Sequence, residues 1–215
     1  MLVACWSAKG GAGTTVVATS LALVLARRHG AGAVLADLAG DAPAALGLAE
    51  PSSPGLAGWL AAGPEVPADA LARLEEDAAP GLALLPRGAG PLAAERSDVL
   101  AALLMADARP VVADCGAGPD GTALTIAAGA TRSVLVTRAC FLALRRAVVA
   151  PLRPSEIVLV TEPGRSLTRL DVEDCLGAPV VAEVAVDPAV ARAVDAGLLA
   201  TRLPRSLARE LNHAA

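Results

Sequence analysis

Aromatic side chains are nearly absent from this chain, which has no tyrosine, one phenylalanine (Phe141) and two tryptophans (Trp6 and Trp59). Few rings remain to stack on nucleobases, so a binding surface built on aromatic stacking is excluded. The net charge of −4 argues against a nucleic-acid partner that engages the whole surface. The core has to be built from leucine, valine and alanine, which is typical of alanine-rich helices packed on valine- and leucine-rich strands.

Cysteine pairs and long apolar runs are missing as well. The cysteines show no CxxC spacing and no neighbouring histidine pair, which excludes a recognisable zinc site or redox pair, and we expect reduced, mostly buried thiols. They are Cys5, Cys115, Cys140 and Cys175. The longest apolar run, Val16 to Ala26, is too short to cross a bilayer, and no signal-peptide pattern is present at residue 1. We expect a cytoplasmic protein, with polar or peripheral inner-membrane placement as a further option.

Short apolar runs alternate with longer alanine- and leucine-rich stretches along the chain. The predicted strands are 2–6, 33–37, 82–85, 111–114, 133–137, 157–161 and 180–186. The predicted helices are 15–28, 56–62, 68–77, 92–108, 120–128, 141–150, 167–176, 188–196 and 204–213. Because the strands are continuously apolar, both faces of the sheet should be covered. The sequence therefore predicts an α/β fold, a doubly wound and mostly parallel sheet flanked by helices, in one domain over residues 1–215.

Residues 39–66 interrupt this alternation with many glycines and prolines. These are Gly40, Pro43, Pro51, Pro54, Gly55, Gly63 and Pro64. The stretch predicts a surface excursion over the carboxyl ends of the strands, where ligands bind in such sheets.

Lysine is the scarcest of the common charged residues. Of the 18 basic residues, 17 are arginine and one is Lys9, in the segment Ser7-Ala8-Lys9-Gly10-Gly11-Ala12-Gly13-Thr14-Thr15. A glycine-rich turn between a strand and a helix aims main-chain N–H groups and a helix N-terminus at an anion. This context favours a phosphate-binding loop, with the alternative of a glycine-rich turn that binds nothing.

The loop lacks the lysine that usually follows its last glycine, because Thr14 stands there. Thr15 remains where the magnesium-binding hydroxyl belongs. A lost charge-assisted contact of about 1.5 to 3 kcal/mol weakens triphosphate binding by about ten- to a hundredfold. Weakened binding of ATP or ADP with magnesium is therefore the expectation.

The pattern Lys9-Gly10-Gly11-x-Gly13 resembles the deviant Walker A loop of the ParA/MinD ATPases. The resemblance implies that Lys9 reaches across a nucleotide-sandwich dimer to the partner's phosphates, and that residues Lys9, Gly10, Gly11, Ala12, Gly13, Thr14 and Thr15 bind nucleotide. The small residue in place of the second lysine is similar to the CpaE/TadZ branch, which is associated with Tad (Flp) pilus assembly and polar placement.

Further motifs resemble the same family. Asp37 matches the first carboxylate of its second motif, while Ala39 stands where the family keeps the carboxylate that orients the attacking water, and Asp41 could replace it. Asp114, in Val111-Val112-Ala113-Asp114-Cys115-Gly116, matches the Walker B aspartate and implies a magnesium site with Thr15. The family's adenine-binding asparagine and IPxD proline correspond to Thr161 and Ala185.

The resemblance thus implies a retained scaffold with a degenerate site, in which Lys9 and Asp37 are the catalytic candidates. Each retained residue also has a structural alternative: Asp37 and Asp114 could hydrogen-bond the adjoining loops, and Lys9 could be a solvated cation.

Two surface features are candidates for partner contacts. Residues 121–155 contain five arginines and no carboxylate: Arg132, Arg138, Arg145, Arg146 and Arg153. They could bind DNA phosphates or an acidic protein, or form a solvated helix face with Phe141 and Leu144 on its buried side. The leucine stripe Leu203, Leu207 and Leu211 could contact a membrane, although we expect it to pack on the core.

Together these observations predict a homodimeric positioning or assembly factor with little or no ATP turnover and a protein partner in a localisation or pilus-assembly system. The first alternative is a slow ATPase, with Asp41 as the replacement carboxylate, in cell-division site placement or DNA partitioning. The second is a nucleotide-free binding module that uses the arginine-rich face.

Overall fold

The computed structural model describes residues 1–63 and 65–215, so Pro64 lies outside the described residues. Its sheet has eight strands in the order β3-β4-β2-β5-β1-β6-β7-β8. The strands are β1 (Leu2–Ser7), β2 (Ala33–Asp37), β3 (Glu76–Ala79), β4 (Leu82–Leu85), β5 (Val111–Ala117), β6 (Arg132–Arg138), β7 (Glu156–Thr161) and β8 (Val180–Ala185). All neighbouring pairs are parallel except β3 and β4. The predicted α/β, mostly parallel fold is confirmed.

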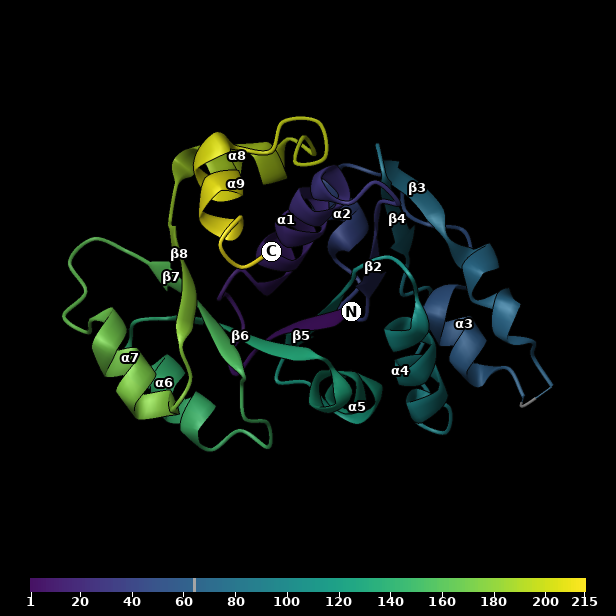
Figure 1. Ribbon diagram of the computed structural model, residues 1–215, viewed down its shortest axis with the longest axis horizontal. Helices are drawn as coiled ribbons and strands as arrows, with labels where there is room; N and C mark the ends of the chain where they lie inside the picture. The colour runs from purple at the N-terminus through teal and green to yellow at the C-terminus, as the bar shows by residue number, and fades with distance from the viewer. Residues whose placement is uncertain (64) are drawn as a thin grey trace.

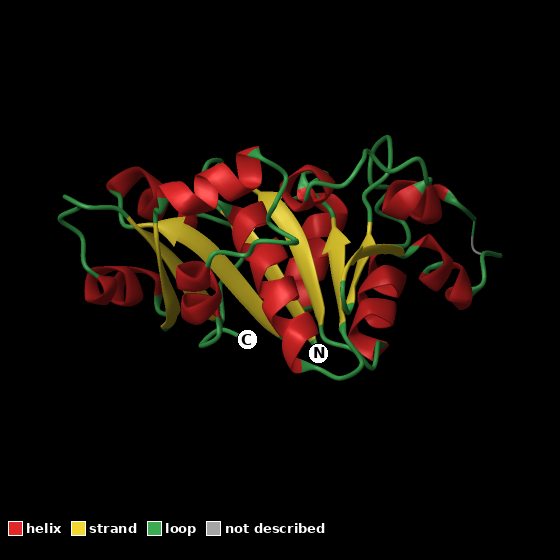
Figure 2. Ribbon diagram, turned by 90° about the horizontal axis from the view of Figure 1, so that it is seen from above, coloured by secondary structure: helices red, strands yellow, loops and turns green. Residues whose placement is uncertain are grey.

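Helices cover both faces of the sheet (Figures 1 and 2). They are α1 (Thr14–Arg28), α2 (Ala42–Leu46), α3 (Gly55–Ala61), α4 (Ser97–Ala106), α5 (Gly121–Gly129), α6 (Phe141–Val148), α7 (Arg169–Leu176), α8 (Pro188–Asp195) and α9 (Arg205–Leu211). Helices α1, α2, α8 and α9 pack on one face, while α3 to α7 pack on the other. Because both faces are covered, all six residues of β1 are buried.

The sequence predicted seven of these strands but placed a helix over residues 68–77, which is wrong. That segment forms two short 3-10 turns, η1 (Ala68–Ala70) and η2 (Ala72–Leu74), and then enters β3. The helix predicted over 92–108 begins only at Ser97. At the end of the first segment, Glu76 and Asp77 pair with the antiparallel strand β4 instead of continuing a helix.

Residues 39–66 are only partly the surface excursion that their composition predicted. Helix α3 lies within this stretch and buries Leu56, Trp59 and Leu60 in the core. The guanidinium of Arg96 stacks 3.8 Å from the centre of the Trp59 ring and donates a hydrogen bond to the Trp59 carbonyl oxygen. Two parts of the stretch lie at the carboxyl ends of the strands: its beginning, around Ala39 and Asp41, and the start of α3, where the N–H of Leu56 donates to the Pro86 carbonyl oxygen directly after β4 at 2.8 Å.

The turn after α2 and the segment after α8 contact each other through the main chains of two glycines, Gly47 and Gly197. Gly47 has a φ of 78°, and a Cβ atom at this position would stand 1.8 Å from the carbonyl oxygen of Gly197. Both glycines are therefore required for the close approach of these two segments.

The two outer strands of the sheet, β3 and β8, differ in what protects their free edges from pairing with another strand. At the start of β8, the N–H of Val180 donates to the Glu173 carboxylate at 2.8 Å, and its carbonyl oxygen accepts from the Arg169 guanidinium at 2.7 Å. Strand β3 is four residues long and includes Glu76 and Asp77.

The C-terminal leucine stripe packs on the core, as expected. Leu203, Leu207 and Leu211 are buried in the cluster that contains α1. No helix among the described residues is both long and apolar enough to span a membrane.

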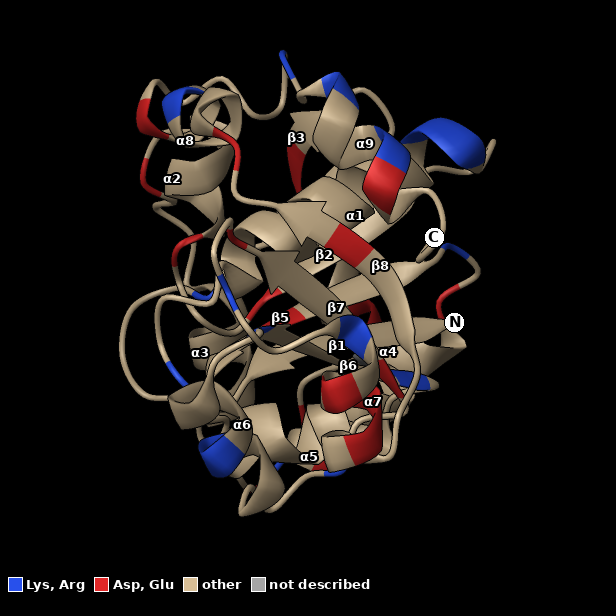
Figure 3. Cartoon of the chain, turned by 90° about the vertical axis from the view of Figure 1, so that its left-hand side faces the viewer, with Lys and Arg blue, Asp and Glu red and all other residues tan. Residues whose placement is uncertain are grey.

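The arginine-rich segment does not form a uniformly basic face (Figure 3). Arg132 pairs with Glu156, and Arg138 pairs with Glu162. Arg145 and Arg146 are exposed on α6, which lies beside the acidic helix α7. The expectation that Phe141 supplies the buried side of α6 is wrong, because the Phe141 side chain is 75% exposed while Leu144 is buried.

A candidate phosphate-binding site

The loop between β1 and α1 has the backbone conformation of an anion cradle. Gly11 and Gly13 have φ values of 78° and 87°, a region that disfavours other residues. No atom lies within 4 Å of a Cβ built on Gly10, Gly11 or Gly13, so the space in front of the loop is open. Helix α1 begins at Thr14, and its first main-chain N–H groups and the positive end of its dipole face this space.

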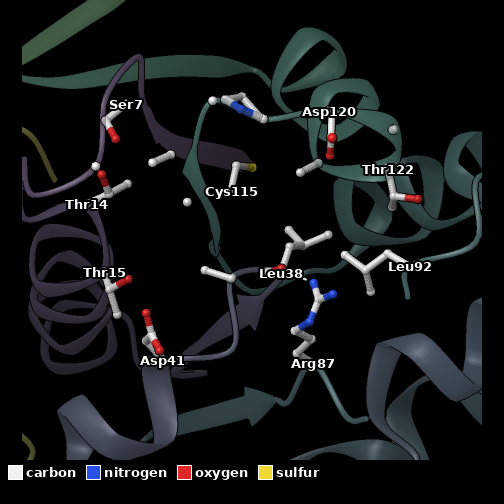
Figure 4. Close-up of a pocket in the computed structure, with 18 of the residues that line it drawn as sticks. Ser7, Thr14, Thr15, Leu38, Asp41, Arg87, Leu92, Cys115, Asp120 and Thr122 are labelled. Atoms are coloured by element: carbon white, nitrogen blue, oxygen red, sulfur yellow. Dashed lines mark hydrogen bonds between the residues drawn. The ribbon is translucent and has the colours of Figure 1, made fainter. Parts of the chain in front are cut away.

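The loop lines a pocket of about 660 Å³ at the carboxyl ends of β1, β2 and β5. The other walls come from the segment after β2, from the segment after β4 and from residues 115–123; the first two contribute Leu38, Ala39, Asp41, Arg87, Pro91 and Leu92. Figure 4 shows the Asp41 carboxylate directed toward Thr15 on one side of the pocket. The structure therefore brings Gly10, Gly11, Gly13, Thr14 and Thr15 together around one cavity.

Asp114 is fully buried and does not itself line this pocket; it directly precedes the lining residue Cys115 and lies opposite Asp37 in the register between β5 and β2. Its Oδ1 accepts the N–H of Gly116 at 3.1 Å, whereas Oδ2 has no hydrogen-bond partner among the described residues. Burial raises the pKa of Asp114 to about 6, although the nearby Thr15 hydroxyl and the Gly116 N–H act to lower it. The Thr15 hydroxyl is thus close enough to affect the carboxyl group without meeting hydrogen-bond geometry.

Asp37 is also fully buried, and its carboxylate holds the loop that follows β2. Oδ1 accepts the N–H groups of Ala39 at 3.0 Å and Gly40 at 2.7 Å, and Oδ2 accepts the N–H of Ala42 at 3.2 Å. Burial raises the pKa of Asp37 against these hydrogen bonds. The carboxylate does not line the main pocket, but the loop that it holds places Ala39 and Asp41 there.

Lys9 turns away from the pocket of its own loop. Its Nζ donates to the carbonyl oxygen of Gly10 at 3.2 Å. The residue lines a smaller cavity on the other side of the loop, with Ala12, Arg138 and Cys140. In the single chain, therefore, this ammonium group does not supply positive charge to the main pocket.

Thr161 and Ala185 end neighbouring strands, since they are register partners in β7 and β8. Neither lines the main pocket. Glu162, next to Thr161, binds both Arg138 and Arg165 and fills this edge with an ion-pair network.

Two of the four cysteines are buried, so the expectation of mostly buried thiols holds for only half of them. Cys5 and Cys115 are buried and all four are free thiols, but Cys140 is half-buried and Cys175 is exposed. Cys115 also lines the main pocket. Burial raises the pKa of its thiol, which keeps the group protonated.

Sequence reasoning missed Arg87 as a site residue. It directly follows Pro86 at the end of β4, and its half-buried side chain enters the pocket wall. The available signal was an isolated arginine at the carboxyl end of a predicted strand, since such ends gather at one edge of a parallel sheet.

The residues present fit a phosphate ligand with a divalent cation. The loop offers main-chain N–H groups to an anion, and the Thr15 hydroxyl and the unpartnered Asp114 Oδ2 are oxygen ligands of the kind that Mg²⁺ prefers. No cluster of three or more His, Cys, Asp or Glu side chains that could hold a metal exists in the described part of the chain. Magnesium would therefore need phosphate oxygens to complete its coordination.

The α/β fold and the glycine-rich loop between β1 and α1 are the arrangement typical of P-loop proteins. No protein-family model matches the sequence, and no curated protein matches it. Solved structures do match. A ParA family ATPase from Chlorobium tepidum TLS is 20% identical with a TM-score of 0.80, covering 98% of this chain and 95% of its own.

Two MinD structures give similar results. The septum site-determining protein MinD from Pyrococcus horikoshii OT3, complexed with Mg-ADP, is 19% identical with a TM-score of 0.79, covering 99% of this chain and 94% of its own. A chain of the MinC:MinD cell division protein complex from Aquifex aeolicus is 17% identical with a TM-score of 0.79, covering 99% of this chain and 93% of its own. The chain has the fold of the ParA/MinD ATPases.

Proposed function

We propose that this protein is a ParA/MinD-like positioning or assembly factor that binds ATP or ADP with magnesium, forms a homodimer and turns nucleotide over slowly or not at all. Within that class we place it with the CpaE/TadZ type, which acts in polar placement or pilus assembly. Its single domain spans residues 1–215, and its partner is a protein of a localisation system at the pole or the inner membrane.

The observation that carries the proposal is the unpartnered Oδ2 of Asp114, which is fully buried next to the pocket-lining Cys115 and near enough to Thr15 for its hydroxyl to influence the carboxyl group. Burying a carboxylate oxygen without a partner is costly, and such groups are rare unless a ligand uses them. Thr15 and Asp114 would hold magnesium, and the N–H groups of Gly10 to Thr15 would hold phosphate. The P. horikoshii relative was complexed with Mg-ADP, which supports this choice of ligand.

Slow turnover is inferred from two positions. Thr14 replaces the lysine that stabilises charge on a transferring phosphoryl group, and Ala39 offers no carboxylate to orient water. The Ala39 side chain lies close to Gly116, because a Cβ on Gly116 would approach the Ala39 Cβ to 3.3 Å. Asp37 contributes by holding the loop on which this position lies.

A slow genuine ATPase is the second candidate, and Asp41 favours it. This residue is exposed and lines the pocket on the side of Thr15 (Figure 4). It could orient water in place of a carboxylate at Ala39. The nucleotide-free module has less support, because two of its five arginines are engaged in ion pairs with Glu156 and Glu162.

Calorimetric titration with Mg-ATP tests the proposal. We expect binding by the parent, binding at least about tenfold weaker for Thr15→Ala, and unchanged binding for Thr125→Ala, a matched threonine on α5. An absence of heat with the parent at millimolar Mg-ATP would reject nucleotide binding.

Restoring the missing groups tests the inferred loss of turnover. Thr14→Lys should raise ATP affinity with little turnover, whereas Thr14→Lys combined with Ala39→Asp should add slow hydrolysis, because binding and water orientation reside on different loops. Phosphate release measures both. A parent that hydrolyses ATP at about 1 per second or more would favour the second candidate. Measurable hydrolysis by the parent that is lost in Asp41→Asn would favour it as well.

A further inference from the structure

The positive charge missing at Thr14 has a counterpart on the opposite wall of the pocket. Among the described residues that line the main pocket, Arg87 is the one Lys or Arg side chain. It comes from the segment after β4, across the cavity from Thr14 and Thr15 (Figure 4). An anion between them would face the N-terminus of α1 on one side and a guanidinium on the other.

The Arg87 guanidinium is held in place by main-chain atoms rather than by a carboxylate. Its Nη1 donates to the carbonyl oxygen of Leu38 at 2.5 Å, and Nη2 donates to that of Gly90 at 3.2 Å. No ion pair of Arg87 occurs within the described part of the chain, although Asp41 and Asp120 line the same cavity. Its charge is therefore not neutralised by a carboxylate, and three of its five N–H groups have no acceptor among these residues.

We propose that Arg87 is the polyphosphate-binding cation of this pocket, which contacts the distal phosphates of a bound nucleotide and so takes over the charge of the lysine absent at Thr14. The inference rests on the proposed nucleotide site and names the residue that selects for phosphate charge there. Because Arg87 also ties the segment after β2, through Leu38, to the segment after β4, it orients the pocket wall that carries Ala39 and Asp41.

Titrations of ATP, AMP and inorganic tripolyphosphate with the full chain test this assignment. Arg87→Ala should weaken ATP and tripolyphosphate binding by about ten- to a hundredfold and change AMP binding by less than about threefold. Arg73→Ala, which removes an exposed arginine paired with Asp69, should bind all three as the parent does.

Two further variants separate charge from loop support. Arg87→Lys keeps the charge and should stay within about tenfold of the parent for ATP, whereas Arg87→Gln keeps a donor for a carbonyl oxygen and should lose as much affinity as Arg87→Ala. The parent's ATP affinity should also fall more steeply with added salt than that of Arg87→Ala. Equal losses for ATP and AMP, or a Gln variant that binds better than the Lys variant, would show that Arg87 only supports the loop and would overturn the proposal.

Failure of this inference differs from failure of the proposed function. If the parent binds ATP and Arg87→Ala binds it equally well, only the role of Arg87 is rejected. If the parent binds tripolyphosphate but not ATP, the nucleotide site is rejected, while a loss of tripolyphosphate binding in Arg87→Ala still supports the anion role. If the parent binds neither, both are rejected.

Discussion

At the scale of single residues, Asp114 makes the folded protein sensitive to pH. Its pKa is raised from the ordinary 3.8 to about 6 by burial, so the folded state binds the proton more tightly than the unfolded state. Between about pH 4 and pH 6 the fold therefore carries more protons, and the free energy of unfolding falls as pH rises. Above pH 6 the fold carries the full cost of a buried charge, which this shift puts at about 3 kcal/mol.

Removing that charge should stabilise the magnesium-free protein at neutral pH. For Asp114→Asn we expect the free energy of unfolding to rise by about 1 to 3 kcal/mol at pH 7.5 and to match the parent near pH 4, as measured by urea unfolding at both pH values. Asp174→Asn, which removes an exposed carboxylate of α7, is the control. A gain that is equally large at pH 4 would mean that the charge of Asp114 is not its cause.

At the scale of elements, the approach of the α2 turn to the end of α8 allows no side chain. Gly47→Ala should lower the free energy of unfolding by about 2 to 4 kcal/mol, because the methyl group meets the Gly197 carbonyl oxygen and the residue must keep a positive φ. The measurement is chemical unfolding with Gly129→Ala as control. Gly129 ends α5 with nothing within 4 Å of an added Cβ, so its substitution should not destabilise.

Helix α6 offers a second comparison within one element. Leu144→Ala should cost about 2 to 4 kcal/mol because it opens a cavity in the core. Phe141→Ala should cost less than about 1 kcal/mol, since the ring is mostly exposed. Thermal unfolding of both variants measures the two losses of stability. If Phe141→Ala lost more stability than Leu144→Ala, the Phe141 ring would have to make a contact that is absent from this single chain.

Strands that are buried on both faces could be predicted from the sequence. A strand that forms only because a distant segment pairs with it could not. The continuous apolar runs of β1 and β5 identify parallel strands directly. Strand β3 has no such signal: the predicted helix over 68–77 ran into its first two residues, which form a strand because they pair with β4. The glycine-rich loop that lines the pocket could be located from its glycines and Lys9, but Arg87 enters the pocket only once β4 lies next to β2.

At the scale of the whole molecule, the orientation of Lys9 bears on self-association. Its ammonium group bonds its own loop and leaves the main pocket of the same chain. A dimer that pairs two such loops around a two-fold axis would give each lysine a partner's phosphate to contact. We expect a homodimer that forms with or without Mg-ATP, since the proposed function does not depend on a hydrolysis cycle.

Light scattering coupled to size exclusion measures this state at tens of micromolar protein. Lys9→Ala should shift the distribution toward monomer with Mg-ATP present, and Arg27→Ala, an exposed cation at the far end of α1, should not. A strict monomer for the parent under both conditions would reject the dimer.

The Glu173 and Arg169 side chains, which bond the edge of the outer strand β8, also limit how copies of this protein can aggregate. A bare strand edge is a template on which another chain can extend the sheet. At Val180 that template is already taken, because Glu173 and Arg169 of α7 occupy both main-chain groups. Glu183, further along β8, adds an exposed carboxylate that pairs with Arg169. A copy that extends the sheet from the start of this edge must first displace the Glu173 and Arg169 side chains from Val180, so growth of the sheet there should be disfavoured.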